Sequence, residues 1–412
     1  MKNLTYQKLL LATVFVILLA VGTWMLYGYI TSWAGQAVMT GRRPGNRSTQ
    51  GYSGRVFSTT AYNRYSEIKK DSERERPTVD KIDLTPKKIS LTEANRAEKS
   101  RTTDSVKNFL SKCETYKPIT YKNLTIVPVK APSSSKHLKM LVLDEALSDK
   151  SIQITEVSRS GRVNTLQVTN NSDKPVFIMA GEILLGAKQD RVLESDIIIP
   201  GKAKKIKVKA YCVEQNRWNY NSNKFHSSGK NANVSVRKAA KVSKSQGKVW
   251  NNVSRSNVGV GAPASGSLSK SYESKKFKEK KDDFSTKFLY IPEDYPGVNG
   301  IVVFVNDRAL VADIFSNREI FRKIWPKLMD SYILEASGRE TSRDKKRNEF
   351  KSTDNLLNSA ISARTSFSKS QGIGKQVKIS SNKIKGTGII YNKIPVHLDI
   401  FPENAKSENI KK

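Results

Sequence analysis

Short apolar runs recur between residues 123 and 213, and they predict strands. Each run is rich in Val and Ile and is bounded by Gly, Asn, Ser or Lys. Short runs with this composition are typical of strands rather than helices. They cover residues 123–129, 152–157, 163–168, 176–180, 196–199 and 206–213. The sequence therefore predicts a strand-rich first half of the folded region.

Residues 300–315 and 386–401 share one pattern, which predicts two similar C-terminal β-hairpins. In each segment an Asn stands between two apolar runs, as a tight hairpin turn requires. The segments align with an offset of 86 residues, and either an internal duplication or the turn chemistry common to hairpins explains the match. The identical positions are Gly300/Gly386, Asn306/Asn392, Asp313/Asp399, Ile314/Ile400 and Phe315/Phe401.

A helix is predicted after the first hairpin. Asn317 can cap it, and apolar residues repeat at helical spacing from Phe321 to Ile333. Pro326 is expected to break or kink this helix, or to begin a second one. With the strands, these helices give an α+β fold class.

Residues 9–30 are apolar and contain no charge. At about 1.5 Å per residue they would span roughly 33 Å, enough for a bilayer core. The run exceeds the apolar core of a typical signal peptide, so an uncleaved anchor is favoured over a cleaved signal. We therefore expect one N-terminal transmembrane helix and a single-pass membrane protein, with the folded domain on the extracytoplasmic side.

The chain divides by composition into five parts. Residues 1–33 form the expected anchor, and residues 34–120 read as a polar, basic and largely disordered linker. A single globular domain is expected over 122–402, with a mobile basic loop near 255–285 and a charged insertion near 337–354. Residues 403–412 form a tail.

Charge points towards anionic partners. Lys and Arg number 72 against 38 Asp and Glu, a net charge of +34. Residues 201–281 hold 20 Lys and Arg but 3 Asp and Glu, so half of the excess lies in this region. Such a surface favours phosphate groups, acidic polymers or acidic lipid, and a merely solvated surface is the alternative. The sequence shows no specific nucleic-acid motif.

Several chemistries are disfavoured. Two cysteines exclude a disulfide-dense scaffold and an all-Cys zinc site. The three histidines are far apart and give no metal spacing, so no metal site is predicted. The sequence has no Gly-x-Ser-x-Gly elbow and no phosphate-binding loop ending in Lys-Ser/Thr. No cofactor is indicated.

The segment 181–191 is the first candidate site. Glu182 follows an apolar strand, and Lys188, Gln189 and Arg191 come directly after it. Carboxylate, amide and guanidinium groups converging there would bind a phosphorylated or polyhydroxyl ligand, with Glu182 as a candidate acid or base. The alternative is a buried Glu182–Arg191 ion pair with a structural role.

The segment 212–218 is the second candidate. Glu214 is a further candidate acid or base, and Arg217 and Trp218 are candidate ligand-binding residues. Aromatic faces beside cations suit stacking on a base or sugar. The alternative is that Trp218 only anchors the loop on the core. Cys212 is read as a small buried hydrophobe rather than a nucleophile.

These segments, in this order, resemble the ARG and Rhodanese-Phosphatase-superfamily-associated Protein domain family, where ARG stands for ADP-ribosylglycohydrolase. The motifs are NLTIVPV (123–129), LDEAL (143–147), GEILLGAKQDR (181–191), CVEQNRW (212–218), WPKLMDSYILEA (325–336) and VHLDIF (396–401). The resemblance implies one domain over about 122–402 and a contextual link to NAD or ADP-ribose metabolism. It does not define an activity, and whether the protein is an enzyme stays open.

The sequence favours two functions. The first is binding of a small anionic ligand, with an ADP-ribose derivative as the candidate. The second is a non-enzymatic adaptor whose basic region grips an anionic polymer or a membrane surface. Their salt dependences differ, because contacts to many phosphates weaken steeply with salt.

Overall fold

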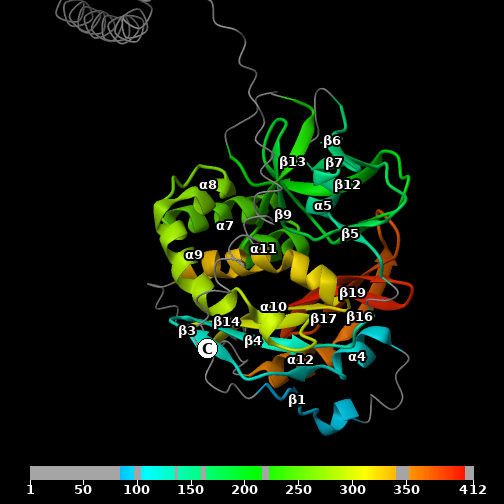
Figure 1. Cartoon of the computed structure of the whole chain (residues 1–412), viewed down its shortest axis with the longest axis vertical. Coiled ribbons are helices and arrows are strands. Elements are labelled where there is room, and N and C mark those ends of the chain that lie inside the picture. The colour runs from blue at the N-terminus through cyan, green and yellow to red at the C-terminus, as the bar shows by residue number, and fades with distance from the viewer. Residues whose placement is uncertain are drawn as a thin grey trace, which may run out of the picture. The chain divides into compact units, whose positions relative to one another are not determined.

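The computed structural model describes residues 84–96, 104–134, 138–158, 164–215, 222–339 and 352–403. All of them belong to one compact unit, residues 56–412. This unit combines a large antiparallel sheet, a small closed barrel and a set of helices (Figure 1). The α+β character predicted from the apolar pattern is therefore present.

The large sheet has ten strands in the order β1-β2-β4-β14-β15-β19-β18-β17-β16, with β3 paired to β4 at the side. The hairpins β14–β15 and β18–β19 meet at the centre of the sheet, where β15 pairs with β19. The bounds are β1 (Lys87–Lys88), β2 (Glu114–Thr115), β3 (Ile119–Tyr121), β4 (Leu124–Lys130), β14 (Gly300–Val305), β15 (Arg308–Phe315), β16 (Arg364–Lys369), β17 (Lys375–Ser380), β18 (Ile384–Tyr391) and β19 (Ile394–Pro402).

The barrel lies between β4 and β14 in the sequence. Six strands close it in the order β10-β12-β7-β6-β13-β9, and a three-stranded sheet, β11-β8-β5, accompanies it. The bounds are β5 (Leu141–Val142), β6 (Ile152–Glu156), β7 (Thr165–Asn170), β8 (Val176–Ile178), β9 (Glu182–Gly186), β10 (Arg191–Leu193), β11 (Ile197–Ile199), β12 (Ile206–Cys212) and β13 (Lys224–Asn231).

Helices cover both faces of the large sheet, with α4 and α12 on one side and α11 on the other (Figure 1). The bounds are α4 (Ser105–Leu110), α5 (Leu143–Ser148), α6 (Val234–Lys238), the π-helical turn η2 (Ala239–Ser243), α7 (Gln246–Gly259), α8 (Leu268–Glu273), α9 (Lys275–Phe288), α10 (Ile291–Asp294), α11 (Arg318–Ser337) and α12 (Thr353–Ile361).

Both predicted hairpins form, and their backbones match in detail. The turn residues Asn306 and Asp307 have φ of 50° and 59°, and Asn392 and Lys393 have φ of 51° and 65°. Two successive left-handed residues are the signature of a two-residue hairpin turn. A register shift follows Val303 in the first hairpin and Ile389 in the second, again 86 residues apart. The shared bulge favours duplication over coincidence, because turn chemistry alone does not fix a bulge.

The helix after the first hairpin runs without a break. Asn317 caps α11 by accepting hydrogen bonds from the backbone N–H groups of Glu319 and Ile320 at 2.8 and 3.1 Å. The expected break or second start at Pro326 is wrong, because α11 continues through it to Ser337. Burial of α11 from Phe321 onwards offsets the backbone hydrogen bond that a proline removes.

Residues 255–285, for which the sequence predicts a mobile loop, lie mainly in helices. They form the end of α7, all of α8 and most of α9. Ser245, Ser267 and Ser274 cap the three helices with their side chains. Phe277, Phe284 and Phe288 then bury one face of α9. Serine caps and a few widely spaced aromatic residues make helices that a low-complexity reading misses.

The expected linker contributes to the sheet at its C-terminal end. Strands β1 and β2 and helix α4 lie within residues 34–120, and β3 begins there. The N-terminal part of this stretch and the tail from residue 404 lie outside the described residues. So does most of the charged segment 337–354.

The prediction of a transmembrane helix, and with it of single-pass membrane localisation, is corrected here. In the ranges that the structure describes, no helix combines the length and the apolar character needed to cross a bilayer. Even α11, with 20 residues, carries seven charged side chains, whereas a span needs about 20 mostly apolar residues. Residues 9–30, on which the prediction rested, lie outside the described residues.

Candidate functional site

The two faces of the large sheet differ in what covers them. The outer face carries an apolar layer that packs against α4 and α12. The inner face carries Asp313 and Asp399, which stand directly opposite each other in β15 and β19. On the β14 side, the inner face is apolar and α11 covers it. On the β18 side the strands pair in the same register as β14 and β15, but the inner face there carries polar side chains.

A polar row crosses the inner face from the centre of the sheet to its edge. Asp313 pairs with Asp399, Asp399 with Thr387, Thr387 with Lys378, and Lys378 with Ser366. Directly opposed residues share a face, so these five side chains form one line across β15, β19, β18, β17 and β16. The row begins at buried carboxylates and ends at an exposed serine.

The other half of the sheet shows that this polarity is not required by the fold. At the position equivalent to Thr387 the first hairpin has Ile301, which is buried. Its neighbour in β4 is Pro128, where β17 has Lys378. One half is therefore apolar and helix-covered, whereas the other is polar and open. Polar side chains that the fold does not need are candidates for function.

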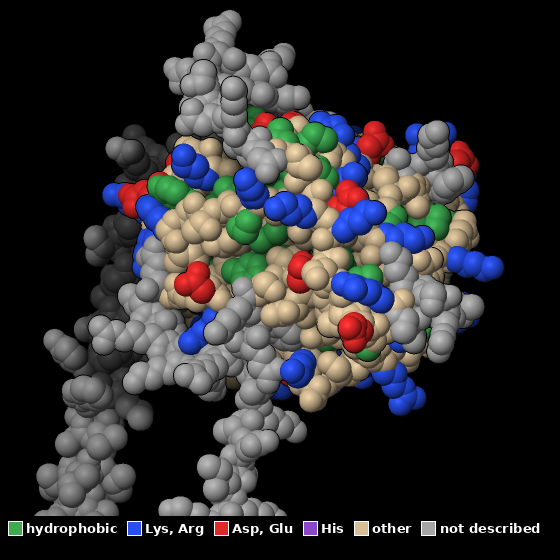
Figure 2. Space-filling model, turned by 90° about the horizontal axis from the view of Figure 1, so that it is seen from below, with side chains coloured by type: hydrophobic (Ala, Val, Ile, Leu, Met, Phe, Trp, Pro, Cys, Tyr) green, Lys and Arg blue, Asp and Glu red, His purple; other side chains and the backbone are tan. Residues whose placement is uncertain are grey.

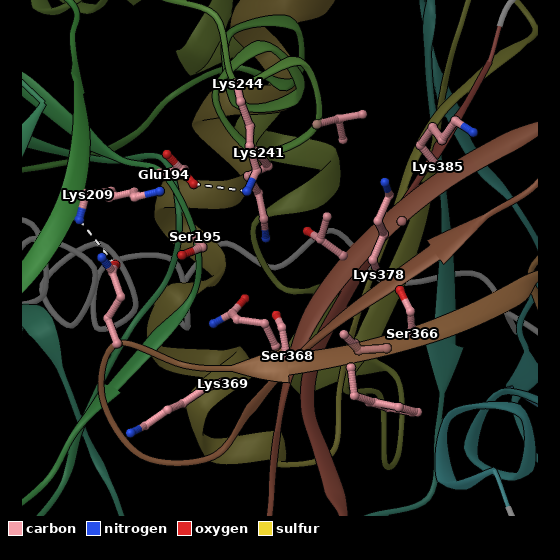
Figure 3. A pocket seen from close by; sticks show the side chains of 17 residues that line it. Glu194, Ser195, Lys209, Lys241, Lys244, Ser366, Ser368, Lys369, Lys378 and Lys385 are labelled. Carbon is pink, nitrogen blue, oxygen red and sulfur yellow. Dashed lines mark hydrogen bonds and ion pairs between the residues drawn. The ribbon is translucent and has the colours of Figure 1, made fainter.

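A cleft of about 540 Å³ lies over the open half, and we call it the lysine cleft (Figure 3). Its floor is the inner face of β16, β17 and β18, and its walls come from the η2 turn and from the barrel. Six lysines and one acidic residue line it. The lysines are Lys209, Lys241, Lys244, Lys369, Lys378 and Lys385, and the acid is Glu194.

The cleft also presents hydroxyl and amide groups. Ser366 and Ser368 alternate with Phe367 on β16, so both serines share the inner face with Gln376 and Lys378 (Figure 3). Lys209 and Lys378 have exposed side chains, and no partner for their ammonium groups occurs among the described residues. Free cations beside hydroxyl groups suit a ligand that carries phosphate and hydroxyls.

Below the cleft lies a buried ionic network centred on Asp313. Arg237 of α6 grips this carboxylate with two hydrogen bonds of 2.7 Å. The Tyr332 hydroxyl donates to it at 2.6 Å, and His397 Nε2 lies 3.2 Å from it. All four residues are fully buried. A bidentate arginine with these extra partners satisfies a charge that burial would otherwise make costly.

The same network reaches the lysine cleft through Lys241. Its Nζ lies 2.5 Å from Asp399 Oδ2 and 3.0 Å from Asp196 Oδ2. Asp196 Oδ2 also lies 2.8 Å from His397 Nδ1, within hydrogen-bond distance. The Thr387 hydroxyl donates a hydrogen bond to Asp399 Oδ1 at 2.7 Å. Lys241 and Thr387 line the cleft, so the floor of the site is continuous with the ionic core.

Burial and charge pull the pKa values of this network in opposite directions. Burial alone would lower the pKa of His397, but the carboxylates of Asp196 and Asp313 outweigh it and raise the pKa. Burial likewise opposes ionisation of Asp313, yet the Arg237 guanidinium holds the pKa of that carboxyl below its usual range. The network is therefore a set of mutually stabilised charges.

The sequence-predicted residue Glu182 lies elsewhere, between the barrel and α11. Its Oε1 pairs with Lys327, which also bonds Asp144 Oδ2 at 2.9 Å. Its Oε2 is buried without a hydrogen-bond partner in the described part of the chain. Burial raises the pKa of Glu182 to about 7, although Lys327 opposes the shift. Glu182 pairs with Lys327 rather than with Arg191.

Arg191 and Gln189 come together around Cys212. Arg191 Nη1 donates to Gln189 Oε1 at 3.1 Å and to Cys212 Sγ at 2.9 Å. Arg191 Nη2 also lies 3.8 Å from a carboxylate oxygen of Glu156. These side chains are buried, and burial raises the pKa of Cys212 to about 11. The burial agrees with the prediction that Cys212 is a small buried residue.

Glu214 holds the loop that contains Lys188 and Gln189. Its carboxylate accepts the backbone N–H of Asp190 at 3.1 Å, and its carbonyl accepts from the Gln189 amide at 3.1 Å. Lys188 is buried in the same loop. Arg217 and Trp218 lie outside the described residues. None of the candidates from the sequence that the structure describes lines the lysine cleft.

Two glycines of the segment 181–191 occupy backbone conformations that other residues rarely adopt. Gly181 and Gly186 have φ of 84° and 114°, which favour glycine. A Cβ on Gly181 would lie 2.4 Å from Asn231 Oδ1, so the backbone there approaches its neighbour closely.

The described part of the chain contains no group of three or more His, Cys, Asp or Glu side chains that could together hold a metal ion. Basic side chains are spread over the face of the molecule seen in Figure 2, with acidic side chains between them. That face therefore shows no continuous basic stripe.

The lysine cleft carried a signal that the sequence reading missed. In 375–380 (KQVKIS), polar and apolar residues alternate with period two from Gln376 onwards, whereas 364–369 (RTSFSK) is polar apart from Phe367. Such alternation predicts strands with one polar face. Which face is open could not be read from the segments alone, because the barrel and the η2 turn that form the walls are distant in sequence.

Comparison with known proteins gives one match. The model of the ARG and Rhodanese-Phosphatase-superfamily-associated Protein domain matches residues 112–401. These residues include the barrel, the lining of the lysine cleft and the strands of the large sheet from β2 onwards. No curated protein and no solved structure matches the chain.

Proposed function

The chain belongs to the ARG and Rhodanese-Phosphatase-superfamily-associated Protein domain family, and we propose that it binds a small phosphorylated, hydroxyl-bearing ligand in the lysine cleft. The observation that carries the proposal is the polar inner face of β16–β18, where Lys378, Ser366 and Thr387 stand in one row. The apolar half of the same sheet has Ile301 and Pro128 at the equivalent positions.

The ligand class follows from the side chains that line the cleft. Lysine ammonium groups supply mobile point charges that suit phosphate. Serine hydroxyls and the Gln376 amide can exchange hydrogen bonds with sugar hydroxyls. A sugar phosphate has both kinds of group, and the ribose and diphosphate of ADP-ribose are one example. The volume of about 540 Å³ lies within the usual range for small-molecule pockets.

The inner-face side chains of the cleft are all non-aromatic. Phe367 belongs to the opposite face of β16, although it is 49% exposed at the rim. Base stacking therefore has no platform among the described residues of the cleft floor. The proposed recognition is of phosphate and hydroxyls rather than of a base.

The proposal is one of binding, without a reaction. Glu182 and Glu214 remain the candidate acid or base residues from the sequence, and neither lines the lysine cleft. A hydrolytic version would need one of them to reach the ligand.

The alternative proposal is an adaptor that grips an anionic polymer through residues 201–281. It is supported by the origin of three cleft lysines, Lys209, Lys241 and Lys244, in that region. Polymer binding through several phosphates should weaken steeply with salt, by about 0.7–0.9 in log affinity per contact for each decade. A ligand with one or two phosphates should show a shallower slope.

Thermal unfolding of the full chain tests the proposal. Ribose 5-phosphate, ADP-ribose, adenosine and inorganic phosphate are compared on the wild type and on Lys209→Ala/Lys378→Ala. At about 100 times its dissociation constant a ligand stabilises by roughly 2.7 kcal/mol. We expect stabilisation by ribose 5-phosphate and ADP-ribose but not by adenosine, and its loss in the double variant. Equal stabilisation of both proteins would contradict the assignment to this cleft.

A further inference from the structure

A second basic pocket lies on the other side of the α6–η2 segment. It has a volume of about 350 Å³ and is lined by five cationic side chains and no carboxylate. We call it the arginine pocket. Its cations are Lys238 of α6, Lys248 and Arg255 of α7, Arg308 of β15, and Arg339, the second residue after α11. It shares no lining residue with the lysine cleft.

Two of these cations are held in place by neighbours. The buried Glu335 carboxylate lies 2.7 Å from Arg339 Nη2, and it also accepts the Ser235 backbone N–H at 2.9 Å. Lys238 donates to the Pro402 carbonyl at 2.6 Å and lies 3.0 Å from Glu403. These contacts orient the side chains before any ligand arrives, which lowers the entropic cost of binding.

The other three cations have no counter-charge among the described residues. Lys248, Arg255 and Arg308 make no ion pair or hydrogen bond through their side chains within the described ranges. Like charges gathered around one hollow repel one another, and an anion placed among them would relieve that repulsion. Arg255 and Arg308 each offer a planar fork that matches the geometry of a phosphate group.

The backbone between the two pockets is itself unusual. Lys241 and Val242 of the η2 turn line the lysine cleft, whereas Ala239 and Ser243 line the arginine pocket. Single π-helical turns are rare and occur frequently at functional sites. This turn therefore presents one short segment to two separate cationic hollows.

We propose that the arginine pocket is a second anion site, which binds a phosphoryl group independently of the lysine cleft. Two sources have this chemistry, a small phosphorylated molecule and the end of a phosphate polymer. The small hollow accepts one or two phosphate groups from either source. Arg255 and Arg308 bind the phosphate oxygens, and Arg339 adds a further positive charge to the pocket wall.

Calorimetric titration of the full chain with pyrophosphate tests this proposal. Three proteins are compared: the wild type, Arg255→Ala/Arg308→Ala and Lys209→Ala/Lys378→Ala. Hydrogen bonds to charged groups are strong enough that loss of both guanidinium groups should weaken the arginine pocket at least about 10-fold. We expect two binding sites in the wild type and one in each double variant. The lysine-cleft variant thus shows separately whether the proposed function fails.

Control variants separate the pocket from general charge. Arg364→Ala removes an exposed arginine that lines neither site, and it should leave both affinities unchanged. Arg255→Lys keeps the charge but loses the fork, and it should weaken the site in part. If Arg308→Ala, which is half-buried, prevents folding, Arg255→Ala alone is used because Arg255 is exposed.

The outcomes decide the proposal. Unchanged pyrophosphate binding in the arginine variants, or an equal loss in Arg364→Ala, would overturn it. Long-chain polyphosphate distinguishes the two sources. Binding of polyphosphate with a steep salt slope, removed by Arg255→Ala, supports a polymer end, whereas pyrophosphate binding with a shallow slope supports a small molecule.

Discussion

Asp313 and Asp399 face each other across β15 and β19, and each is neutralised by a cation from the same helical segment. Arg237 binds Asp313, and Lys241 lies 2.5 Å from Asp399. The two aspartates are 86 residues apart and equivalent in the two hairpins. The α6–η2 segment thus ties together the two halves of the sheet at their centre, and on one side it forms a wall of the lysine cleft.

Breaking the first of these pairs should be costly. Arg237→Met leaves the Asp313 carboxylate buried, with Tyr332 and His397 as its remaining partners in the described part of the chain. Removing one partner of a buried ion pair typically costs about 3–5 kcal/mol. Chemical denaturation should show a loss of that size. Lys244→Ala, an exposed substitution directly after the same segment, removes a surface ion pair with Glu194 and should cost less than about 1 kcal/mol.

The charge on His397 makes the fold sensitive to pH. Its pKa is raised in the folded state, because Asp196 and Asp313 outweigh the effect of burial. A raised pKa contributes stability that is complete below the unfolded value of about 6.5 and is lost as the pH rises through the folded pKa. Urea unfolding from pH 6 to 9 should therefore show falling stability. In His397→Asn this decline should be smaller, and parallel curves for the two proteins would contradict the assignment.

Glu182 should make folding stability depend on pH in a lower range than His397 does. Its folded-state pKa of about 7 exceeds the ordinary value of 4.5, so the folded protein binds this proton more tightly than the unfolded chain. Stability should then fall as the pH rises from about 4.5 to about 7. In Glu182→Gln this part of the pH dependence should disappear, while Lys327 keeps its bond to Asp144. An unchanged slope between pH 4.5 and 7 in the variant would show that burial does not raise this pKa.

Many of the strands could be predicted from periodicity. Three of the six barrel strands, β6, β7 and β12, and both hairpins follow from Val- and Ile-rich runs and from the Asn turns at 306 and 392. The barrel strand β13 was not predicted, because its sequence KFHSSGKN has no Val or Ile. The charged helix α9 was missed because its apolar contacts are only Phe277, Phe284 and Phe288, diluted among lysines. Local composition suggested a loop, but tertiary burial of three rings decided otherwise.

The candidate site was less predictable than the fold. The sequence drew attention to Glu182, Gln189 and Arg191, and the structure places all three in buried contacts. Arg191 pairs with Gln189, and Glu182 pairs with Lys327. Sequence alone does not separate such buried pairing from ligand binding. The lysine cleft depends on register instead. Lys378 faces Ser366 and Thr387 only because of how β16, β17 and β18 pair.

Hydroxyl recognition in the cleft predicts a selective loss. Ser366→Ala/Ser368→Ala removes two hydroxyl groups from the inner face but leaves every lysine in place. Two neutral hydrogen bonds are together worth about 5- to 100-fold in affinity. Titration should therefore show weaker ribose 5-phosphate binding in this variant, with inorganic phosphate affected much less. An equal loss for both ligands would mean that the serines do not read the sugar.

The most direct test of the lysine cleft compares two lysines on one strand. Lys378 lies on the inner face of β17 and lines the cleft, whereas Lys375 is exposed on the opposite face and does not line it. Titration of ADP-ribose into the full chain should show affinity at least about 10-fold weaker in Lys378→Ala and unchanged in Lys375→Ala. Equal affinities in the wild type and Lys378→Ala, or equal losses in the two variants, would contradict the account.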